Sequence, residues 1–238
     1  MIIEKKSKKW AVFTLVLFLL LTVTVGCSTG EVKDKLDSTT SIKNEYRRYV
    51  QGVLDCSYKG DIDNYIKICS ADRKEAEECY DAATVYYAEG LMFELAVPAS
   101  YLSENMLEKW YDFGKKGLME TDYTVEEAVK KDGRWLIEVK VRPMDMLTDE
   151  IVDKVIEFHA SFVEKYKGQD FESMSDEEYM PYADEYAEGV LQILTDNFEK
   201  REYLEEQSKT LEIKIDGNSY SVEESEWTVI DDMVMAFK

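Results

Sequence analysis

The apolar positions of this chain change their period several times, and each change marks a different kind of element. From residue 41 to about residue 118 they recur every three to four residues, which predicts amphipathic helices. Between residues 123 and 141 they alternate with polar residues, which predicts strands with one buried face. Helical spacing returns from about residue 148 to residue 198, and alternation returns near the C-terminus. The predicted order is helices, hairpin, helices, hairpin.

Four serines mark the predicted starts of helices. Ser41 and Ser70 each precede a helical run, where a hydroxyl can accept a hydrogen bond from a backbone N–H group of the first turn, and a further helix is expected from about Ser103 to Leu118. Ser175 stands three residues before Glu178, which is the spacing of a capping box. These positions define the expected N-termini of the main helices.

Two Asp-Gly pairs separate alternating runs and predict β-hairpins. They are Asp132-Gly133 and Asp216-Gly217, and Asp-Gly suits the tight turn that two such strands need. Residues 227–237 are expected to form a last strand. Helices followed by antiparallel hairpins define an α+β fold in which the helices pack on the hairpins.

The order of elements resembles that of cystatin-like and nuclear-transport-factor-2-like rolls, and it fits two tandem roll-like units. The first unit is expected over residues 41–145 and the second over residues 146–238. Short repeats occur in the two halves, for example the Tyr-Lys-Gly that starts at Tyr58 and again at Tyr166. Duplication and chance both remain open as their explanation.

The N-terminal segment carries the longest apolar run of the chain. Four lysines lie within the first nine residues, and residues 10–25 contain no charged side chain. Sixteen residues are fewer than the roughly 20 that span a bilayer as a helix. A basic start followed by a short apolar run is typical of a secretory signal, although an uncleaved signal anchor is the alternative.

Residues 24–27, Thr-Val-Gly-Cys, resemble the lipobox of bacterial lipoproteins. In that family the cysteine receives a diacylglycerol, and a peptidase cuts directly before it. The resemblance implies a signal peptide over residues 1–26, cleavage between Gly26 and Cys27, and lipidation of Cys27. Residues 27–40 are polar and are expected to form a tether. Thr24 departs from the leucine usual in the family.

The charge of the chain is strongly negative. Without residues 1–26, 25 basic and 49 acidic residues remain, a net charge of −24. Binding to nucleic acid needs clusters of Lys and Arg that neutralise phosphates, so this balance argues against a nucleic-acid partner. By the same reasoning, the overall charge argues against peripheral binding to anionic lipid headgroups.

The sequence contains no recognisable catalytic or metal-binding motif. Cys56, Cys69 and Cys79 do not have zinc-ligand spacing, and their odd number allows at most one internal disulfide, so buried thiols are expected. His159 is the only histidine, and it is expected on the apolar face of its helix as a core residue rather than as a general base. No catalytic residue, metal ligand or cofactor is therefore assigned.

Tyrosines recur on one helical face in the second half of the chain. Tyr179, Tyr182 and Tyr186 stand at positions i, i+3 and i+7. A tyrosine combines an apolar ring with a hydrogen-bonding hydroxyl, so such a row suits binding of a sugar or a peptide. The alternative is a packing stripe in the core.

The layout as a whole is similar to uncharacterised surface lipoproteins of Gram-positive, clostridial-type bacteria. The resemblance is carried by the lipobox, by the acidic, Tyr- and Glu-rich body, and by the segments YVQGVLDCSYKGD and YIKI within residues 49–68. It implies a lipid-anchored protein on the extracytoplasmic face of the cell membrane. The expected function is a ligand-binding or protein-interaction module. An enzyme with its site in a roll cavity and an accessory subunit of an envelope transporter or sensor are the alternatives.

Overall fold

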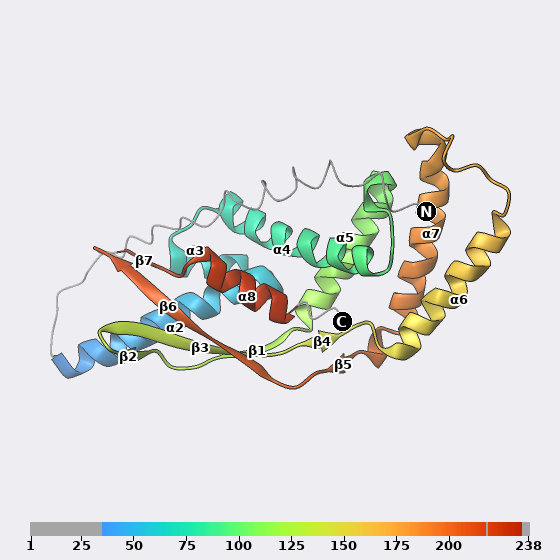
Figure 1. The fold of residues 1–238 in the computed structure, drawn as a ribbon. Helices are drawn as coiled ribbons and strands as arrows, with labels where there is room; N and C mark the ends of the chain where they lie inside the picture. The colour runs from blue at the N-terminus through green and yellow to red at the C-terminus, as the bar shows by residue number, and fades with distance from the viewer. Residues whose placement is uncertain (1–34, 218, 235–238) are drawn as a thin grey trace. The chain divides into compact units, whose positions relative to one another are not determined.

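The computed structural model describes residues 35–217 and 219–234, and the elements are labelled as in Figure 1. Helical segments are interspersed with antiparallel strands, so the fold is α+β, as the order of elements predicted. The helices are α2 (Lys35–Lys59), α3 (Ile62–Cys69), α4 (Arg73–Glu94), α5 (Glu104–Met119), α6 (Asp149–Lys165), α7 (Asp176–Asp196) and α8 (Glu224–Val234), with short 3-10 turns η3 (Ala99–Tyr101) and η4 (Phe198–Lys200). The strands are β1 (Asp122–Val125), β2 (Val129–Lys131), β3 (Arg134–Arg142), β4 (Met144–Asp145), β5 (Glu202–Tyr203), β6 (Gln207–Asp216) and β7 (Ser219–Ser221).

Both predicted hairpins belong to one five-stranded sheet. Its order is β1-β3-β6-β7, and β2 also pairs with β3. In the β2–β3 hairpin Asp132 and Gly133 have φ angles of 51° and 80°, the left-handed conformation that a tight hairpin turn requires at both positions. In the second hairpin Asp216 of β6 pairs with Ser219 of β7. The two hairpin predictions are confirmed.

β3 shows the expected alternation of buried and exposed side chains. Trp135, Ile137, Val139 and Val141 are all less than 10% exposed, whereas the residues between them are only partly buried. Successive side chains of a strand point to opposite faces, so one face of β3 carries the core. Pairing of this long strand with β6 joins the two halves of the chain in a single sheet.

The helix start expected near Ser103 and the predicted capping box of Ser175 and Glu178 are confirmed. The Ser103 hydroxyl accepts a hydrogen bond from the Met106 amide at 3.3 Å and starts α5. At the start of α7 the Ser175 hydroxyl accepts from the Glu178 amide, and the Ser175 amide donates to the Glu178 carboxylate at 2.9 Å. This reciprocal pair is the predicted capping box.

The cap predictions for Ser41 and Ser70 are wrong. Ser41 lies inside α2, which already begins at Lys35. Ser70 ends α3 in the left-handed conformation, with φ of 54°, and α4 begins three residues later. There the Asp72 carboxylate accepts from the Glu75 amide at 2.8 Å. An aspartate is as good a helix cap as a serine, and the two candidates stand only two residues apart in the sequence.

The predicted last strand over residues 227–237 is also wrong. The described part of this segment is the helix α8. Trp227, Ile230 and Val234 are buried at 7%, 0% and 1% exposure, and their spacing of three and four residues is that of one helical face. In a strand Trp227 and Ile230 would point to opposite faces, so the burial pattern itself requires a helix.

By their internal contacts, the residues form two compact units that interleave along the chain. Unit 1 contains the described residues of 35–83, 124–139 and 208–230, and unit 2 contains 84–123, 140–207 and 231–234. The boundary expected from the sequence, between residues 145 and 146, falls inside a segment of unit 2. The difference arises because the pairing of β3 with β6 brings strands from both halves of the chain into one sheet.

The core of unit 1 forms where α2 packs on the two hairpins. The ring of Tyr46 lies edge-on to Trp135 and to Tyr220, at centroid distances of 5.4 Å and 5.2 Å. Tyr49, one turn further along α2, contacts Tyr220 at 5.1 Å. Burial raises the pKa of Tyr49, so its hydroxyl stays neutral within this core.

The core of unit 2 is built around α5. Trp110 is fully buried, and Phe113 lies edge-on to Phe198 at 5.7 Å. Gly117 faces the ring of buried Tyr87 so closely that an added Cβ atom would come within 2.7 Å of it. A glycine is therefore needed here for α5 to approach Tyr87.

Candidate functional site

The predicted tyrosine row of α7 belongs to an aromatic cluster in unit 2. Tyr182 lies edge-on to Tyr166 at 5.0 Å and to Phe171 at 5.2 Å, and Phe171 also contacts Tyr179 at 5.6 Å. Edge-on ring pairs each stabilise a fold by about 0.5–1.5 kcal/mol beyond the burial of their area. We call this set the α6–α7 aromatic cluster; its rings are Tyr101, Phe158, Phe162, Tyr166, Phe171, Tyr179, Tyr182 and Tyr186.

Tyr186 is the most buried member of the predicted row. It is 7% exposed, it lies 5.2 Å from Phe162, and its hydroxyl donates to the Leu95 carbonyl oxygen at 3.4 Å. Burial raises its pKa, as it does for Tyr179. Ring contacts thus give Tyr179, Tyr182 and Tyr186 a packing role between α6 and α7, and their ligand-binding role stays a prediction.

The single histidine does not occupy the core position that its helical face predicted. His159 is exposed on α6, and its ring lies edge-on to Tyr186 at 5.7 Å. Its neighbours on the same face, Ile156 and Val163, are 59% and 55% exposed. The helix buries Ile151 and Val155 instead. The core-histidine prediction is therefore wrong, because the buried face of α6 is rotated from the face that the apolar pattern suggested.

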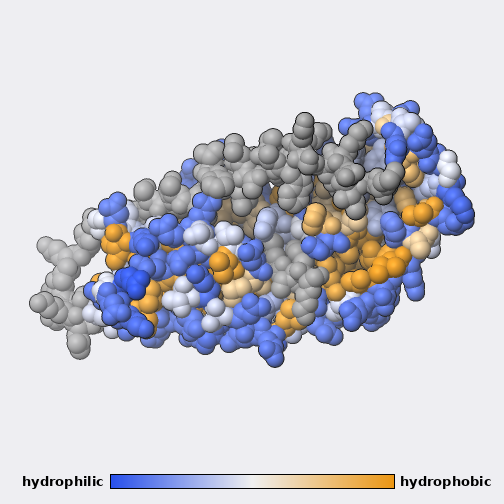
Figure 2. Space-filling model, viewed as in Figure 1, coloured by the Kyte–Doolittle hydropathy of each residue, from blue (hydrophilic) through white to orange (hydrophobic). Residues whose placement is uncertain are grey.

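Figure 2 shows one face of the molecule, on which hydrophobic residues are exposed among hydrophilic ones. Exposed apolar side chains are common on soluble proteins and identify no site when they stand alone. Large side chains of this kind in the described residues include Val129 on β2, Ile156 and Val163 on α6, and Ile215 on β6.

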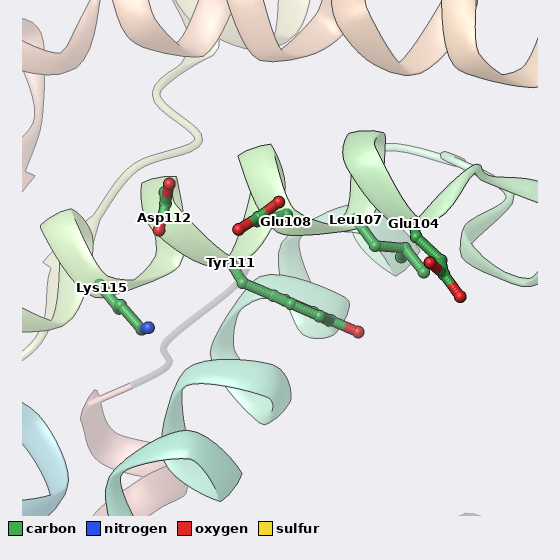
Figure 3. A pocket seen from close by; sticks show the side chains of 6 residues that line it. All are labelled: Glu104, Leu107, Glu108, Tyr111, Asp112 and Lys115. Carbon is green, nitrogen blue, oxygen red and sulfur yellow. The ribbon is translucent and has the colours of Figure 1, made fainter.

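An open hollow lies along one face of α5 (Figure 3). Its volume is about 360 Å³, and its described lining comes from this one helix: Glu104, Leu107, Glu108, Tyr111, Asp112 and Lys115. Three carboxylates and a single ammonium group give the hollow a negative charge. With walls from one helix, the described residues form a contact surface rather than an enclosed reaction site.

Tyr111 connects this hollow to α4. In Figure 3 its ring points away from the α5 axis, and its hydroxyl donates to the Glu89 carboxylate at 3.4 Å. Burial raises the pKa of Glu89, while the hydrogen bond from Tyr111 opposes that rise. Burial also raises the pKa of Tyr111, to about 12. The sequence offered one unused signal for this pair, a carboxylate within the apolar segment YYAEGLMF.

The cysteines of unit 1 are thiols, as predicted, and no disulfide joins any of them in the described chain. Cys56 and Cys69 are buried, and the Cys56 thiol donates to the Ala76 carbonyl oxygen at 3.5 Å. A hydrogen bond with Cys79, together with burial, strongly raises the pKa of Cys56. Burial raises the pKa of Cys69 to about 12. Protonated, enclosed thiols are poor nucleophiles and poor metal ligands.

Within residues 35–217 and 219–234, no three acidic, cysteine or histidine side chains are arranged so that they could hold a metal ion. In the same part of the chain, every helix is too short or too polar to cross a membrane. Gly26 and Cys27 lie outside the described residues, so signal cleavage and lipidation stay predictions.

The comparisons with known proteins give a likeness of fold. Neither a protein-family model nor a curated protein matches the chain. A solved structure does match, that of YcdA, a candidate lipoprotein from Bacillus subtilis, with a TM-score of 0.55 and 19% sequence identity. The match covers 84% of this chain and 59% of YcdA, so this chain spans about three fifths of the length of that protein.

The fold therefore defines an α+β protein whose architecture is shared by a protein of a Gram-positive bacterium. That protein is described as a lipoprotein candidate, which agrees with the resemblance of this sequence to lipoproteins of Gram-positive bacteria.

Proposed function

We propose that this chain is a bacterial lipoprotein held at the extracytoplasmic face of the cell membrane by a diacylglycerol on Cys27. The observation that carries the proposal is the cysteine directly after the short apolar run, preceded by glycine in a lipobox-like segment. The shared fold with a candidate lipoprotein supports it. A diacylglycerol brings two acyl chains to one site, which meets the need for two signals in stable anchoring.

The lipid anchor is tested by substituting its attachment site in the full-length precursor. In Cys27→Ala we expect the protein to leave the membrane fraction or to accumulate as uncut precursor, because neither acylation nor the following cut can occur. Ser28→Ala is the matched control, since it changes the next residue and leaves the thiol. Intact mass spectrometry of each protein measures both modifications. Unchanged membrane retention and unchanged mass in Cys27→Ala would contradict the anchor.

We further propose that the body is a ligand-binding or protein-interaction module, with a partner that carries positive charge. The open, acidic hollow on α5 supports this role, because Glu104, Glu108 and Asp112 face solvent beside the apolar Leu107. Carboxylates at such a surface attract amines and basic protein segments. In this proposal no residue of the body carries out catalysis.

An enzyme is the competing function, and Glu89 is the observation that favours it. A half-buried carboxylate whose pKa is raised by burial is a candidate general base. A defined turnover reaction that is abolished in Glu89→Gln or His159→Ala, in protein that keeps its fold, would replace the interaction module by an enzyme.

A further inference from the structure

Two short segments of unit 1 carry an excess of positive charge within a strongly acidic chain. Residues 43–48, KNEYRR, contain three cations and one acid, and residues 129–134, VKKDGR, contain the same numbers. Together these segments hold six of the 29 Lys and Arg residues and only two of the 50 acids. They stand about 85 residues apart, so the sequence alone does not reveal that they belong together.

The fold brings the two segments to the same edge of unit 1. Trp135 links them, because its ring contacts Tyr46 of α2 at 5.4 Å and lies 5.7 Å from the Lys130 ammonium. Next to Tyr46, the Arg47 guanidinium donates to the Val125 carbonyl oxygen at 3.0 Å. In Figure 1, α2 crosses the β2–β3 hairpin. We call the five exposed cations of these two segments the basic edge; they are Arg47, Arg48, Lys130, Lys131 and Arg134.

All five residues of the basic edge are exposed. Among the described residues Arg134 pairs with Glu212 at 3.2 Å, and Glu212 also accepts from Lys214. The acids of the neighbouring sequence are Glu45, Glu126, Glu127 and Asp132. The five cations of the edge together with Lys214 therefore outnumber these four acids and Glu212 by one, in contrast to the acidic chain as a whole.

Protection of the sheet edge against pairing with another chain explains only some of the cations of the basic edge. β2 is a short strand with three exposed residues, and lysines on such a strand hinder pairing with another chain. That role fits Lys130 and Lys131. It does not fit Arg47 and Arg48, which lie on a helix.

The distance along the chain from the predicted anchor limits where the basic edge can lie. Eight residues lead from Cys27 to Lys35, the first residue of α2, and they reach at most about 28 Å when fully extended. Arg47 is 12 residues further along α2, a rise of about 18 Å. The basic edge is thus held within a few tens of ångströms of the bilayer, where even weak attraction is effective.

We propose that the basic edge lies on the anionic lipid headgroups of the membrane that holds Cys27, and so fixes the orientation of unit 1. This inference rests on the lipid anchor of the proposed function. Headgroup phosphates attract Lys and Arg within a Debye length, whereas they repel the acidic remainder of the chain. The argument from total charge against lipid binding fails here, because it averages over a surface on which the charges are segregated. Val129, 51% exposed beside Lys130, adds an apolar contact.

The test measures the reactivity of individual lysines in the full-length, lipidated protein. The protein is inserted into nanodiscs of phosphatidylcholine alone or with about one third phosphatidylglycerol, and is labelled with a small uncharged amine-reactive reagent. Mass spectrometry then gives the labelling rate of each lysine. We expect Lys130 and Lys131 to react about threefold more slowly in the anionic discs. Lys67 and Lys74, which are exposed on α3 and α4 of the same unit, are internal controls with unchanged rates.

Two further conditions separate surface attraction from other causes. At roughly 1 M salt, where the Debye length is about 3 Å, the difference between the discs should disappear. It should also disappear in Arg48→Glu/Arg134→Glu, and should weaken in the milder Arg48→Gln/Arg134→Gln. Arg73→Glu/Lys109→Glu changes the charge equally outside the basic edge and should preserve the difference.

Equal rates in the two kinds of disc, or equal slowing of all four lysines, would overturn the proposal. A further result would also overturn it: soluble poly(glycerol phosphate), added to protein in neutral discs, slows the labelling of Lys130 and Lys131 as strongly as anionic discs do. That result would assign the basic edge to a phosphate polymer instead of the membrane. If Cys27 carries no lipid, the protein does not enter the discs at all. That result contradicts the anchor and is distinct from a retained protein whose lysines react equally.

Discussion

Glu150, near the start of α6, accepts hydrogen bonds from two lysines. The Lys154 ammonium lies 2.8 Å from its carboxylate and the Lys200 ammonium lies 2.7 Å away. Lys154 also donates to the Asn197 side chain at 2.6 Å. The two hydrogen bonds lower the pKa of Glu150 from 4.5 to about 2. This exposed network connects α6 with the segment that follows α7.

The stability that Glu150 contributes should depend on pH. Because its pKa is lower in the folded than in the unfolded state, the contribution is present above pH about 4.5 and is lost as the pH falls through about 2. We expect Glu150→Gln to lower the melting temperature at pH 7, and to match the wild type near pH 2. Thermal unfolding followed by circular dichroism across this range measures the difference.

Glu172→Gln is the control, because Glu172 is an exposed carboxylate that forms no ion pair with the described residues. It should leave the melting temperature nearly unchanged at every pH. A Glu150→Gln difference that persists at pH 2, or that is absent at pH 7, would show that the lysines do not stabilise the ionised carboxylate in the fold.

At the scale of residues, the periodicity of the sequence predicted the helix α6 but not which of its faces is buried. Val155 and His159 both belong to the apolar pattern of α6, and the helix buries the first while it exposes the second. The pattern spans a stripe wider than the contact that α7 can cover, and side chains at its margin can be either buried or exposed. Which margin is covered depends on the partner helix, and the sequence of α6 carries no information about it.

α6 and α7 offer a matched pair of helix starts within unit 2. Ser175 forms a complete capping box with Glu178, whereas the Thr148 side chain at the start of α6 makes no capping hydrogen bond. Both residues have the extended backbone typical of a cap, near ψ of 160° and 150°. The two positions therefore differ mainly in the hydrogen bonds of their side chains.

Removal of these two hydroxyl groups should have unequal effects. We expect Ser175→Ala to lower the free energy of unfolding by about 1 kcal/mol, because the Glu178 amide loses the hydroxyl that accepts its hydrogen bond and the Glu178 carboxylate loses the hydroxyl donor. Thr148→Ala should lower the free energy of unfolding by less than about 0.5 kcal/mol. Urea unfolding of both variants measures the difference. Equal losses would show that the capping hydrogen bonds add nothing beyond backbone conformation.

At the scale of elements, the sequence predicted hairpins better than helix limits. Asp132-Gly133 identifies its turn because few residues adopt positive φ at two successive positions. The helix starts predicted at Ser41 and Ser70 were wrong, because any serine can cap a helix and nearby residues such as Asp72 can form the cap instead. α8 was missed because Trp227, Val229 and Ile230 are β-favouring residues, and tertiary packing overrides such preferences.

The whole molecule has a connectivity that the order of elements could not reveal. The chain passes from one unit to the other five times, and five elements contain residues of both units: α4, α8, β1, β3 and β6. A sequence-based boundary assumes that neighbours along the chain are neighbours in space. That assumption fails where a long strand such as β3 pairs with a strand from the other half.

Shared elements should make the two units unfold together. Leu54 of unit 1 and Leu194 of unit 2 are 1% and 0% exposed, so replacement of either by alanine should lower the melting temperature by roughly 4–20 °C. In calorimetry we expect one transition in each variant, with a calorimetric enthalpy equal to the van't Hoff enthalpy. Two resolved transitions, of which each variant shifts only one, would show that the units are thermodynamically independent.

The same connectivity limits when the protein can fold during the proposed export. Unit 1 needs residues 208–230 to complete its sheet, and those residues are synthesised after all the other segments of unit 1. On the proposed lipoprotein route, the chain leaves the translocation channel from its N-terminus, so its first 200 residues emerge before their partners. The anchor on Cys27 would then be attached to an unfolded chain. Unit 1 would complete its fold at the membrane surface, only after residues 208–230 had crossed.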